Sequence, residues 1–225
     1  MKWLYVAASL ALFITMLIYS QLDTSAATEL TAKLPIAETI AQESSVPNAV
    51  TGIIFKNRLY DTIFEVVVFT IAIMGVRFLL ADEQPSHTVY QFTDQPSIVL
   101  ARLGATIAAL VGIELAIRGH LSPGGGFAAG VAGGTAIGLV AITSPSEWME
   151  AVYKQWRASA WEKVSVLLFI AIALLSLFGL ALPPGIPGNL LSGGWIPILN
   201  TLVAIKVALG SWATVLIFVR YRGLL

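Results

Sequence analysis

Six long stretches of the chain are almost free of charged residues. Each is close to the 20 or so mostly apolar residues that a helix needs to cross a bilayer. None shows a sustained alternation of apolar and polar residues, so the pattern indicates helices rather than the strands of a barrel. We therefore predict an all-α integral membrane protein with about six transmembrane helices, over roughly 3–22, 59–81, 98–118, 125–143, 162–182 and 196–219.

The composition agrees with a lipid environment. Apolar residues make up 57% of the 225 residues and charged residues 12%, whereas a soluble domain carries about 25% charged residues. There is no cysteine, which excludes disulfides, iron–sulfur clusters and thiolate metal sites. Balanced charge without a Lys/Arg run argues against nucleic acid. No nucleophile–base set, metal cluster or nucleotide loop is recognisable, so we predict no metal site, no cofactor and no standalone enzyme.

The first apolar stretch has two interpretations. Its length favours a retained helix, but the Met-Lys start, the apolar run and the small residues Ser25-Ala26-Ala27 also resemble a cleavable signal peptide.

Orientation follows from the distribution of Lys and Arg, because cytoplasmic loops carry an excess of them. With six spans, one side has Lys33, Lys56, Arg58 and Arg118. The opposite side, which holds both termini, has twice as many: Lys2, Arg77, Arg102, Lys154, Arg157, Lys163, Arg220 and Arg222. We therefore predict a multi-pass protein of the plasma membrane with the N- and C-termini in the cytoplasm.

Ionisable residues within the predicted spans are the candidates for function, since such residues are costly in a membrane and mark ion paths, proton relays or partner contacts. Arg58, Asp61 and Glu65 are three and four residues apart, so they share one helix face near the outer side. They are either a mouth that attracts cations or an ordinary helix N-terminus, where acidic residues are favoured.

Two further spans carry charge. Glu114 and Arg118 are four residues apart, and Glu114 is either a proton-exchanging carboxylate or one half of a local ion pair. Lys206 lies in the middle of the last span, too deep to reach water from a helix end, so it must face protein or a water-filled space. We expect its partner to be Glu114 or a carboxylate of another subunit.

The segment between the third and fourth spans cannot be an ordinary helix interior. It runs through His120, Pro123, Gly124, Gly125 and Gly126, and both proline and consecutive glycines oppose a helix. We predict a tight structural turn, followed by glycines that allow another helix to approach closely. His120 titrates near neutral pH when unperturbed, so it is either a proton relay or an interfacial hydrogen-bonding group.

Residues 98–220 resemble the B subunit of the Mrp-type multisubunit cation/proton antiporters. One motif is Gly-His-Leu-Ser-Pro-Gly-Gly-Gly-Phe over 119–127, close to the family's Gly-His-x-x-Pro-Gly-Gly-Gly-Phe. The other is Ser-Gly-Gly-Trp-Ile-Pro-Ile-Leu-Asn over 192–200, followed by Lys206. Ala128 and Ala129 replace the commoner Gln-Gly, so one polar contact of the family is absent.

Residues 46–81 resemble a different piece, the C-terminal end of the antiporter A subunit, which is a separate small E-type subunit in related membrane-bound hydrogenases. The run 48–54, Arg58, Asp61-Thr62 and Glu65 carry this likeness. Lys56 and Phe64 depart from it, since the family has an acidic residue and a glycine at these positions, and this weakens the inferred role of the outer mouth in collecting cations.

The resemblance implies a fusion of a two-span unit (1–81), a linker (82–97) and a four-span unit (98–225). It implies a membrane subunit of a multisubunit Na+/H+ antiporter that contributes to assembly and to the ion path, with the other subunits as partners and Na+ and H+ as the transported ions. The path would use Glu65, Glu114, His120 and Lys206, then Asp61 and Arg58. The alternative is an accessory or purely structural subunit of a complex I-like or hydrogenase-type redox-driven complex.

Overall fold

The computed structural model describes residues 35–86, 88–89 and 91–223, and every regular element within these ranges is a helix. The prediction of an all-α protein is therefore confirmed for this part of the chain. The predicted span 3–22, and with it the choice between retention and cleavage, lies outside the described residues.

Four helices of the described part are long and apolar enough to cross a membrane: α5 (Leu59–Leu79), α6 (Gln95–Arg118), α9 (Ala158–Leu177) and α10 (Ile196–Arg222). The apolar helix α7 (Gly126–Ala141) has 16 residues, about 24 Å at 1.5 Å per residue. This is somewhat shorter than the roughly 30 Å of a hydrocarbon core. One helix thus corresponds to each predicted span after residue 58.

The short helices are α3 (Ile36–Ser44), α4 (Ala49–Gly52), the π-helical turn η1 (Ile53–Asn57) and α8 (Ser146–Gln155). Asn48 caps α4, because its side-chain oxygen accepts hydrogen bonds from the backbone N–H groups of Val50 and Thr51 at 3.1 and 3.4 Å.

Helix boundaries follow signals that are present in the sequence. Asp94 caps α6 by accepting a hydrogen bond from the Ser97 backbone N–H at 3.0 Å. The Ser97 contact also lowers the pKa of the Asp94 carboxyl. At the C-terminus of α10, Gly223 takes the left-handed conformation (φ 61°) that closes many helices. Helix α9 ends before the predicted limit of 182, and Gly179 (φ 84°) follows it in a left-handed conformation.

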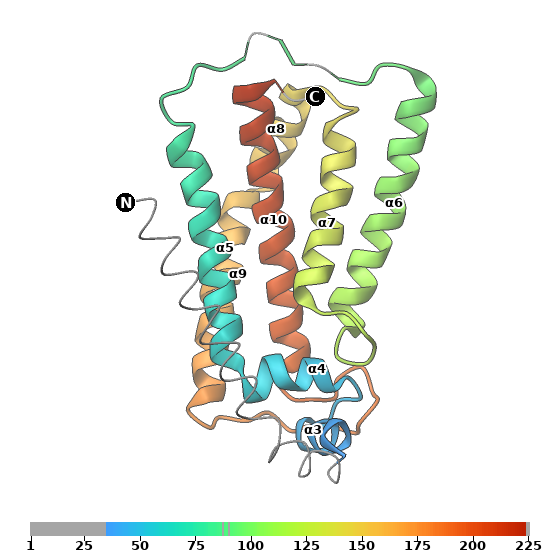
Figure 1. Cartoon of the computed structure of the whole chain (residues 1–225), viewed down its shortest axis with the longest axis vertical. Helices are drawn as coiled ribbons and strands as arrows, with labels where there is room; N and C mark the ends of the chain where they lie inside the picture. Colours follow the sequence, from blue (N-terminus) through green and yellow to red (C-terminus); the bar gives the residue numbers. More distant parts are fainter. Residues whose placement is uncertain (1–34, 87, 90, 224–225) are drawn as a thin grey trace, which may run out of the picture. The chain divides into compact units, whose positions relative to one another are not determined.

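The helices from α4 onward belong to one compact unit, Ile40–Leu225. Within this unit α10 packs against α5, α6, α7, α8 and α9. Figure 1 shows α5 and α6 at two edges of the bundle, with α10 and α7 between them. Residues of α10 are therefore placed to meet side chains from every other spanning helix.

Glycines of α7 allow it to lie directly against α10. A Cβ atom at Gly126 would lie 2.3 Å from the Asn200 carbonyl oxygen, and one at Gly130 would lie 2.4 Å from Val207 Cβ. Small residues at a helix interface permit this close approach. The predicted glycine-mediated contact is confirmed, and the helix that it accommodates is α10 of the same chain.

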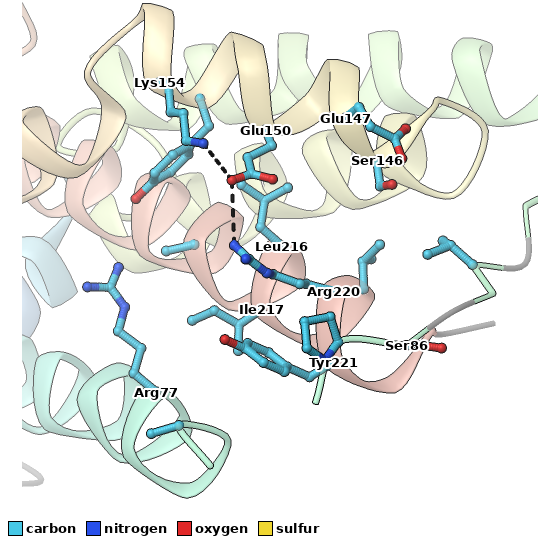
Figure 2. Close-up of a pocket in the computed structure, with 16 residues that line it drawn as sticks. Arg77, Ser86, Ser146, Glu147, Glu150, Lys154, Leu216, Ile217, Arg220 and Tyr221 are labelled. Carbon is cyan, nitrogen blue, oxygen red and sulfur yellow. Dashed lines mark ion pairs between the residues drawn. The ribbon is translucent and has the colours of Figure 1, made fainter. Parts of the chain in front are cut away.

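A cavity of about 750 Å³ opens between α5, α8 and α10, at the end of the bundle where α5 and α10 finish. Figure 2 shows Arg77 reaching toward it from α5, and Glu150 and Lys154 facing it from α8. Arg220 of α10 lies 3.6 Å from the Glu150 carboxylate. The bundle thus has a hollow at this end, whose lining combines several charged side chains with a larger apolar surface.

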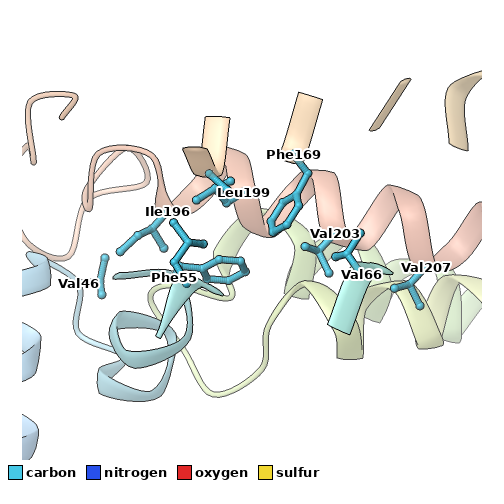
Figure 3. Close-up of a cluster of buried hydrophobic side chains, with 10 residues drawn as sticks. Val46, Phe55, Val66, Phe169, Ile196, Leu199, Val203 and Val207 are labelled. Carbon is cyan, nitrogen blue, oxygen red and sulfur yellow. The ribbon is translucent and has the colours of Figure 1, made fainter. Parts of the chain in front are cut away.

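A hydrophobic core lies between α5, η1, α9 and α10 (Figure 3). Phe55, Val66, Phe169, Leu199 and Val203 are among its fully buried members. It continues along α10 to Val207, the residue directly after Lys206.

Candidate functional site

An ion pair is buried beside this hydrophobic core. The Nζ atom of Lys206 on α10 lies 2.5 Å from the Oε1 atom of Glu162 on α9. Only 1% of the Lys206 side chain and 8% of the Glu162 side chain are exposed. The prediction that Lys206 faces protein or water is confirmed, and within the described residues it faces protein.

The space for the lysine ammonium is made by neighbouring helices. Phe69 of α5 presents its ring to it, with Lys206 Nζ 5.3 Å from the ring centroid, within range of a cation–π attraction. Gly210 lies one helical turn after Lys206, and a Cβ there would come 3.4 Å from Nζ and 2.5 Å from Ile73 Cδ1. Glycine at 210 therefore lets α5 and α10 approach closely next to the charge.

The apolar surroundings determine the free energy of burying these two charges. Taking a charge out of water into a low-dielectric interior costs several kcal/mol per ion, so a buried pair adds little net stability. Removing one partner is expensive, because the other charge then stays buried and uncompensated. The two charges thus depend on one another, and a change in the protonation of either one changes the forces on both.

Glu162 is the functional candidate that the sequence interpretation missed. It precedes Lys163 at the start of an apolar stretch, so it resembles an ordinary helix-end charge. A signal was nevertheless present: Glu162, Ser165, Phe169 and Ala173 follow one another at helical spacing and form the buried face of α9. An acidic residue on an inward stripe of otherwise small or apolar residues is the feature that would have pointed to it.

Glu114 is not the partner of Lys206, which corrects our expectation. Its carboxylate lies 3.2 Å from Arg118 Nη1 one turn further along α6, and 55% of the Glu114 side chain is exposed. The physical reason is the direction of the side chain. The residues of α6 that are buried are Ala101, Ala105 and Gly112, and Glu114 lies on a different face.

The outer-mouth residues are also on the surface of the described bundle. Arg58 and Asp61 form an ion pair at the start of α5, where a helix N-terminus favours acidic groups. Glu65 lies one turn later and is exposed, and it has no salt-bridge partner among the described residues. The structure brings Arg58 and Asp61 together but does not join Glu65 to Lys206.

The predicted turn between α6 and α7 is present and is held by side chains from α4. Gly124 and Gly125 have φ values of 148° and 152°, in a region that other residues rarely adopt. The Asn48 side-chain amide donates hydrogen bonds to the carbonyl oxygens of Gly119 at 2.9 Å and Ser122 at 2.8 Å. The Thr51 hydroxyl donates to the Gly119 carbonyl at 2.8 Å.

His120 lies in this turn and is completely buried. Neither ring nitrogen has a hydrogen-bond partner among the described residues. Burial lowers the pKa of His120 below its ordinary value, although the nearby backbone of Asn189 and Leu190 partly opposes this. The imidazole is therefore held in its neutral form to a lower pH than a solvated histidine.

Asn200 ties the same turn to α10. Its amide donates hydrogen bonds to the carbonyl oxygens of Leu115 at 3.1 Å and Ala116 at 2.7 Å at the end of α6. Lys206 follows six residues later on the same helix. The turn and the ion pair are thus connected through α10.

This arrangement defines the class of the protein. Apolar helices that leave large hydrophobic side chains exposed on their outer faces, with charges sealed inside, are typical of a multi-pass membrane protein that carries ionisable groups at depth. A sequence model described as "Domain related to MnhB subunit of Na+/H+ antiporter" matches residues 96–213, just over half of the chain. The chain belongs to this family.

The matched range includes the turn at 119–126 and both Glu162 and Lys206. Residues 46–81 lie outside it, so their resemblance to the A-subunit end stays a prediction. The division into 1–81, 82–97 and 98–225 likewise stays a prediction.

Two solved structures share this fold, and one further relative is similar in sequence. A chain of the membrane-bound sulfane sulfur reductase, an archaeal respiratory membrane complex, is 25% identical with a TM-score of 0.64, over 96% of this chain and 99% of that one. A chain of the Mrp complex from Dietzia sp. shares the fold at 18% identity and a TM-score of 0.59, over 93% of this chain and 25% of that one. An uncharacterised protein of Methanocaldococcus jannaschii is 24% identical over 73% of this chain and 74% of its own length.

Proposed function

We propose that the chain, a subunit of a multisubunit Na+/H+ antiporter-like complex, takes part in the ion path of that complex through the buried Glu162–Lys206 pair. The single observation that carries this proposal is the pair itself: two opposite charges 2.5 Å apart, sealed between α9 and α10. Such a pair contributes little to stability, whereas ionisable groups within a membrane are by default functional.

The pair can convert proton occupancy into movement of a side chain. A proton bound to Glu162 removes the negative charge and with it the attraction on Lys206. The ammonium then keeps the Phe69 ring as its neighbouring group, 5.3 Å away. Loss of the proton restores the pair. The protonation state of Glu162 therefore decides how strongly the Lys206 ammonium is held at this position.

We propose a different role for Glu65 and Glu114, at contacts with partner subunits. Both carboxylates lie on the outer faces of spanning helices, α5 and α6. A carboxylate facing lipid at depth is costly, so each marks a face that a partner subunit covers. In the assembled complex they continue the ion path across subunit boundaries, with Asp61 and Arg58 at the mouth beside Glu65.

His120 belongs to the outer end of this path. It is buried and neutral in the turn that Asn48 and Thr51 hold in place. A neutral imidazole with two ring nitrogens can accept a proton at one and release it from the other. By the predicted orientation, this end of the bundle faces the outside of the cell.

The proposal is tested by Na+/H+ antiport in vesicles that contain the whole complex. Glu162→Gln keeps the size and removes the charge, and Lys206→Met keeps the apolar stem. We expect both variants to melt at a lower temperature but still to assemble, and to lose antiport. Glu83→Gln is the matched control, since Glu83 is an exposed carboxylate outside the spanning helices, paired with Arg222. Normal antiport by assembled Glu162→Gln and Lys206→Met complexes would refute the relay.

A second candidate function is a subunit of a redox-driven complex, and one observation favours it. The structural neighbour with the higher TM-score, 0.64, comes from a respiratory membrane complex. Under this alternative the charges serve either a redox-driven ion path or helix docking alone. Genes for an oxidoreductase beside this one would favour it, whereas antiporter subunit genes alone would not. In a purely docking role, Glu162→Gln would disrupt assembly on blue-native gels.

A further inference from the structure

The cavity is bounded by α5, the segment that follows α5, α8 and α10, and α8 packs against α9, the helix that carries Glu162. Its lining includes Arg77 from α5, Glu147, Glu150, Tyr153 and Lys154 from α8, and Arg220 from α10. At about 750 Å³ it has room for many water molecules. Figure 2 shows these charged groups arranged around the hollow rather than packed into it.

Tyr153 is the lining residue that connects the cavity with Glu162. Its hydroxyl is buried and has no hydrogen-bond partner among the described residues. Its ring packs edge-on against Trp212, with centroids 5.2 Å apart, which fixes its position. Burial raises the pKa of Tyr153, and the negative charge of Glu162 raises it further. Arg77 and Ser159 oppose the rise, and Ser159 lies about one helical turn before Glu162 on α9.

We propose that this cavity is the aqueous entrance by which protons reach Glu162, and that the Tyr153 hydroxyl is the last relay between water and the carboxylate. The inference rests on the proposed role of Glu162. In the relay step a cavity water gives a proton to the Tyr153 oxygen while the phenolic proton moves to Glu162. Tyrosine is unchanged, the carboxylate becomes a carboxylic acid, and the water becomes hydroxide or is resupplied with a proton from solution.

The charges of the lining suit protons better than metal cations. Three basic groups, Arg77, Lys154 and Arg220, face the cavity against two acidic groups, Glu147 and Glu150. Glu150 is shared, with Lys154 Nζ at 2.7 Å and Arg220 Nη1 at 3.6 Å. No carboxylate of the described residues lies within 4.0 Å of Arg77. A bound Na+ would need several free oxygen ligands and meets a surplus of positive charge here, whereas proton transfer between neutral water, Tyr153 and Glu162 places no cation in the cavity.

The first test removes the hydroxyl alone. In vesicles with the complete complex, Tyr153→Phe keeps the ring that packs on Trp212. We expect the maximal rate of antiport to fall by about tenfold or more, the scale of a lost proton-transfer group. The Na+ KM and the assembly on blue-native gels should stay unchanged, which a merely structural role would not produce. Tyr60→Phe, on the exposed part of α5, is the control and should transport normally.

The second test measures water in the cavity. Because the chain has no cysteine, single cysteines in it can be labelled without background from this subunit. Ile217 lines the cavity, and its neighbour Phe218 lines a different, apolar groove beside α7 at the same depth. A charged, membrane-impermeant thiol reagent should label Ile217→Cys much faster than Phe218→Cys, detected on this subunit by mass spectrometry.

The outcomes separate this inference from the proposed function. If Tyr153→Phe transports normally while Glu162→Gln does not, the entrance is wrong and the relay at Glu162 stands. An unlabelled Ile217→Cys would also overturn the entrance. If Glu162→Gln transports normally, the relay role of Glu162 is refuted. The cavity then has no carboxylate to supply, so its role as a proton entrance is refuted as well.

Discussion

Lys206 Nζ and Glu162 Oε1 meet at 2.5 Å although their residues are 44 positions apart in the chain and lie on different spanning helices. Each charge is compensated only because α9 and α10 pack side by side. The packing of α9 against α10 and the compensation of the two charges therefore depend on each other. A change that separates the helices should break the ion pair, and a change that removes one charge should weaken the packing.

A double-mutant cycle at this pair should show strong coupling. Glu162→Gln or Lys206→Met alone leaves one buried charge without a partner, and each should cost about 3–5 kcal/mol of stability. The double variant leaves no charge behind and should cost clearly less than the two single changes added together. Thermal unfolding of the solubilised protein at fixed detergent concentration measures this. Simple additivity would mean that the two side chains do not interact.

Two glycine-to-alanine substitutions on α7 should distinguish the effect of helix packing on stability from the effect of helix propensity. Gly130→Ala places a Cβ 2.4 Å from Val207 Cβ and 2.8 Å from the Ala204 carbonyl oxygen, so α7 must move away from α10 and stability should fall. Gly138→Ala is the matched control on the same helix, because nothing lies within 4 Å of its new Cβ. It should be neutral or slightly stabilising, by up to about 1 kcal/mol. Equal melting temperatures for the two variants would contradict the close contact.

His120 should make stability depend on pH in acid. Its pKa is lowered in the folded protein by burial, so the unfolded state binds a proton more readily. Stability should be constant above about pH 6.5, the ordinary pKa of histidine, and should fall as the pH drops from there toward the lower pKa of the folded state. His120→Gln should flatten this part of the profile of melting temperature against pH. A wild-type slope that persists in the variant would assign it to another group.

The outward carboxylates should matter for assembly. Because Glu114 is paired with Arg118 but half-exposed on α6, we expect Glu114→Leu to weaken association with the neighbouring subunit while leaving the isolated chain folded. Blue-native gels of the complex and melting of the isolated chain measure the two effects. Glu83→Leu, in an exposed pair with Arg222 outside the spanning helices, serves as the control. Intact complexes with Glu114→Leu would place this face against lipid.

Much of this architecture could be predicted from the sequence, and the physics explains which parts. Long apolar runs give α5, α6, α7, α9 and α10 directly, since length and hydropathy alone decide whether a segment can span. The turn at 123–126 was predictable because proline and three glycines exclude a helix there. The depth of Lys206 was also evident from its place in the apolar run.

The partner of Lys206 was not predictable in the same way. Pairing of two charged side chains depends on which helices are neighbours and on which face each helix presents to the other. A hydropathy profile gives neither. Glu114 and Glu162 both lie near the ends of spans, yet only Glu162 lies on a buried stripe. The cavity beside Tyr153 is equally a product of packing, since its walls come from three helices and from the segment after α5, which are distant from one another in the sequence.

The distance of 44 residues between Glu162 and Lys206 also bears on how the protein is made. During synthesis α9 emerges before α10, so Glu162 leaves the ribosome 44 residues before its lysine. Until α10 arrives, α9 must either stay beside the insertion machinery or hold its acid in protonated form. Biogenesis of this subunit thus favours the release of α9 and α10 into lipid together, as a hairpin that is already neutral.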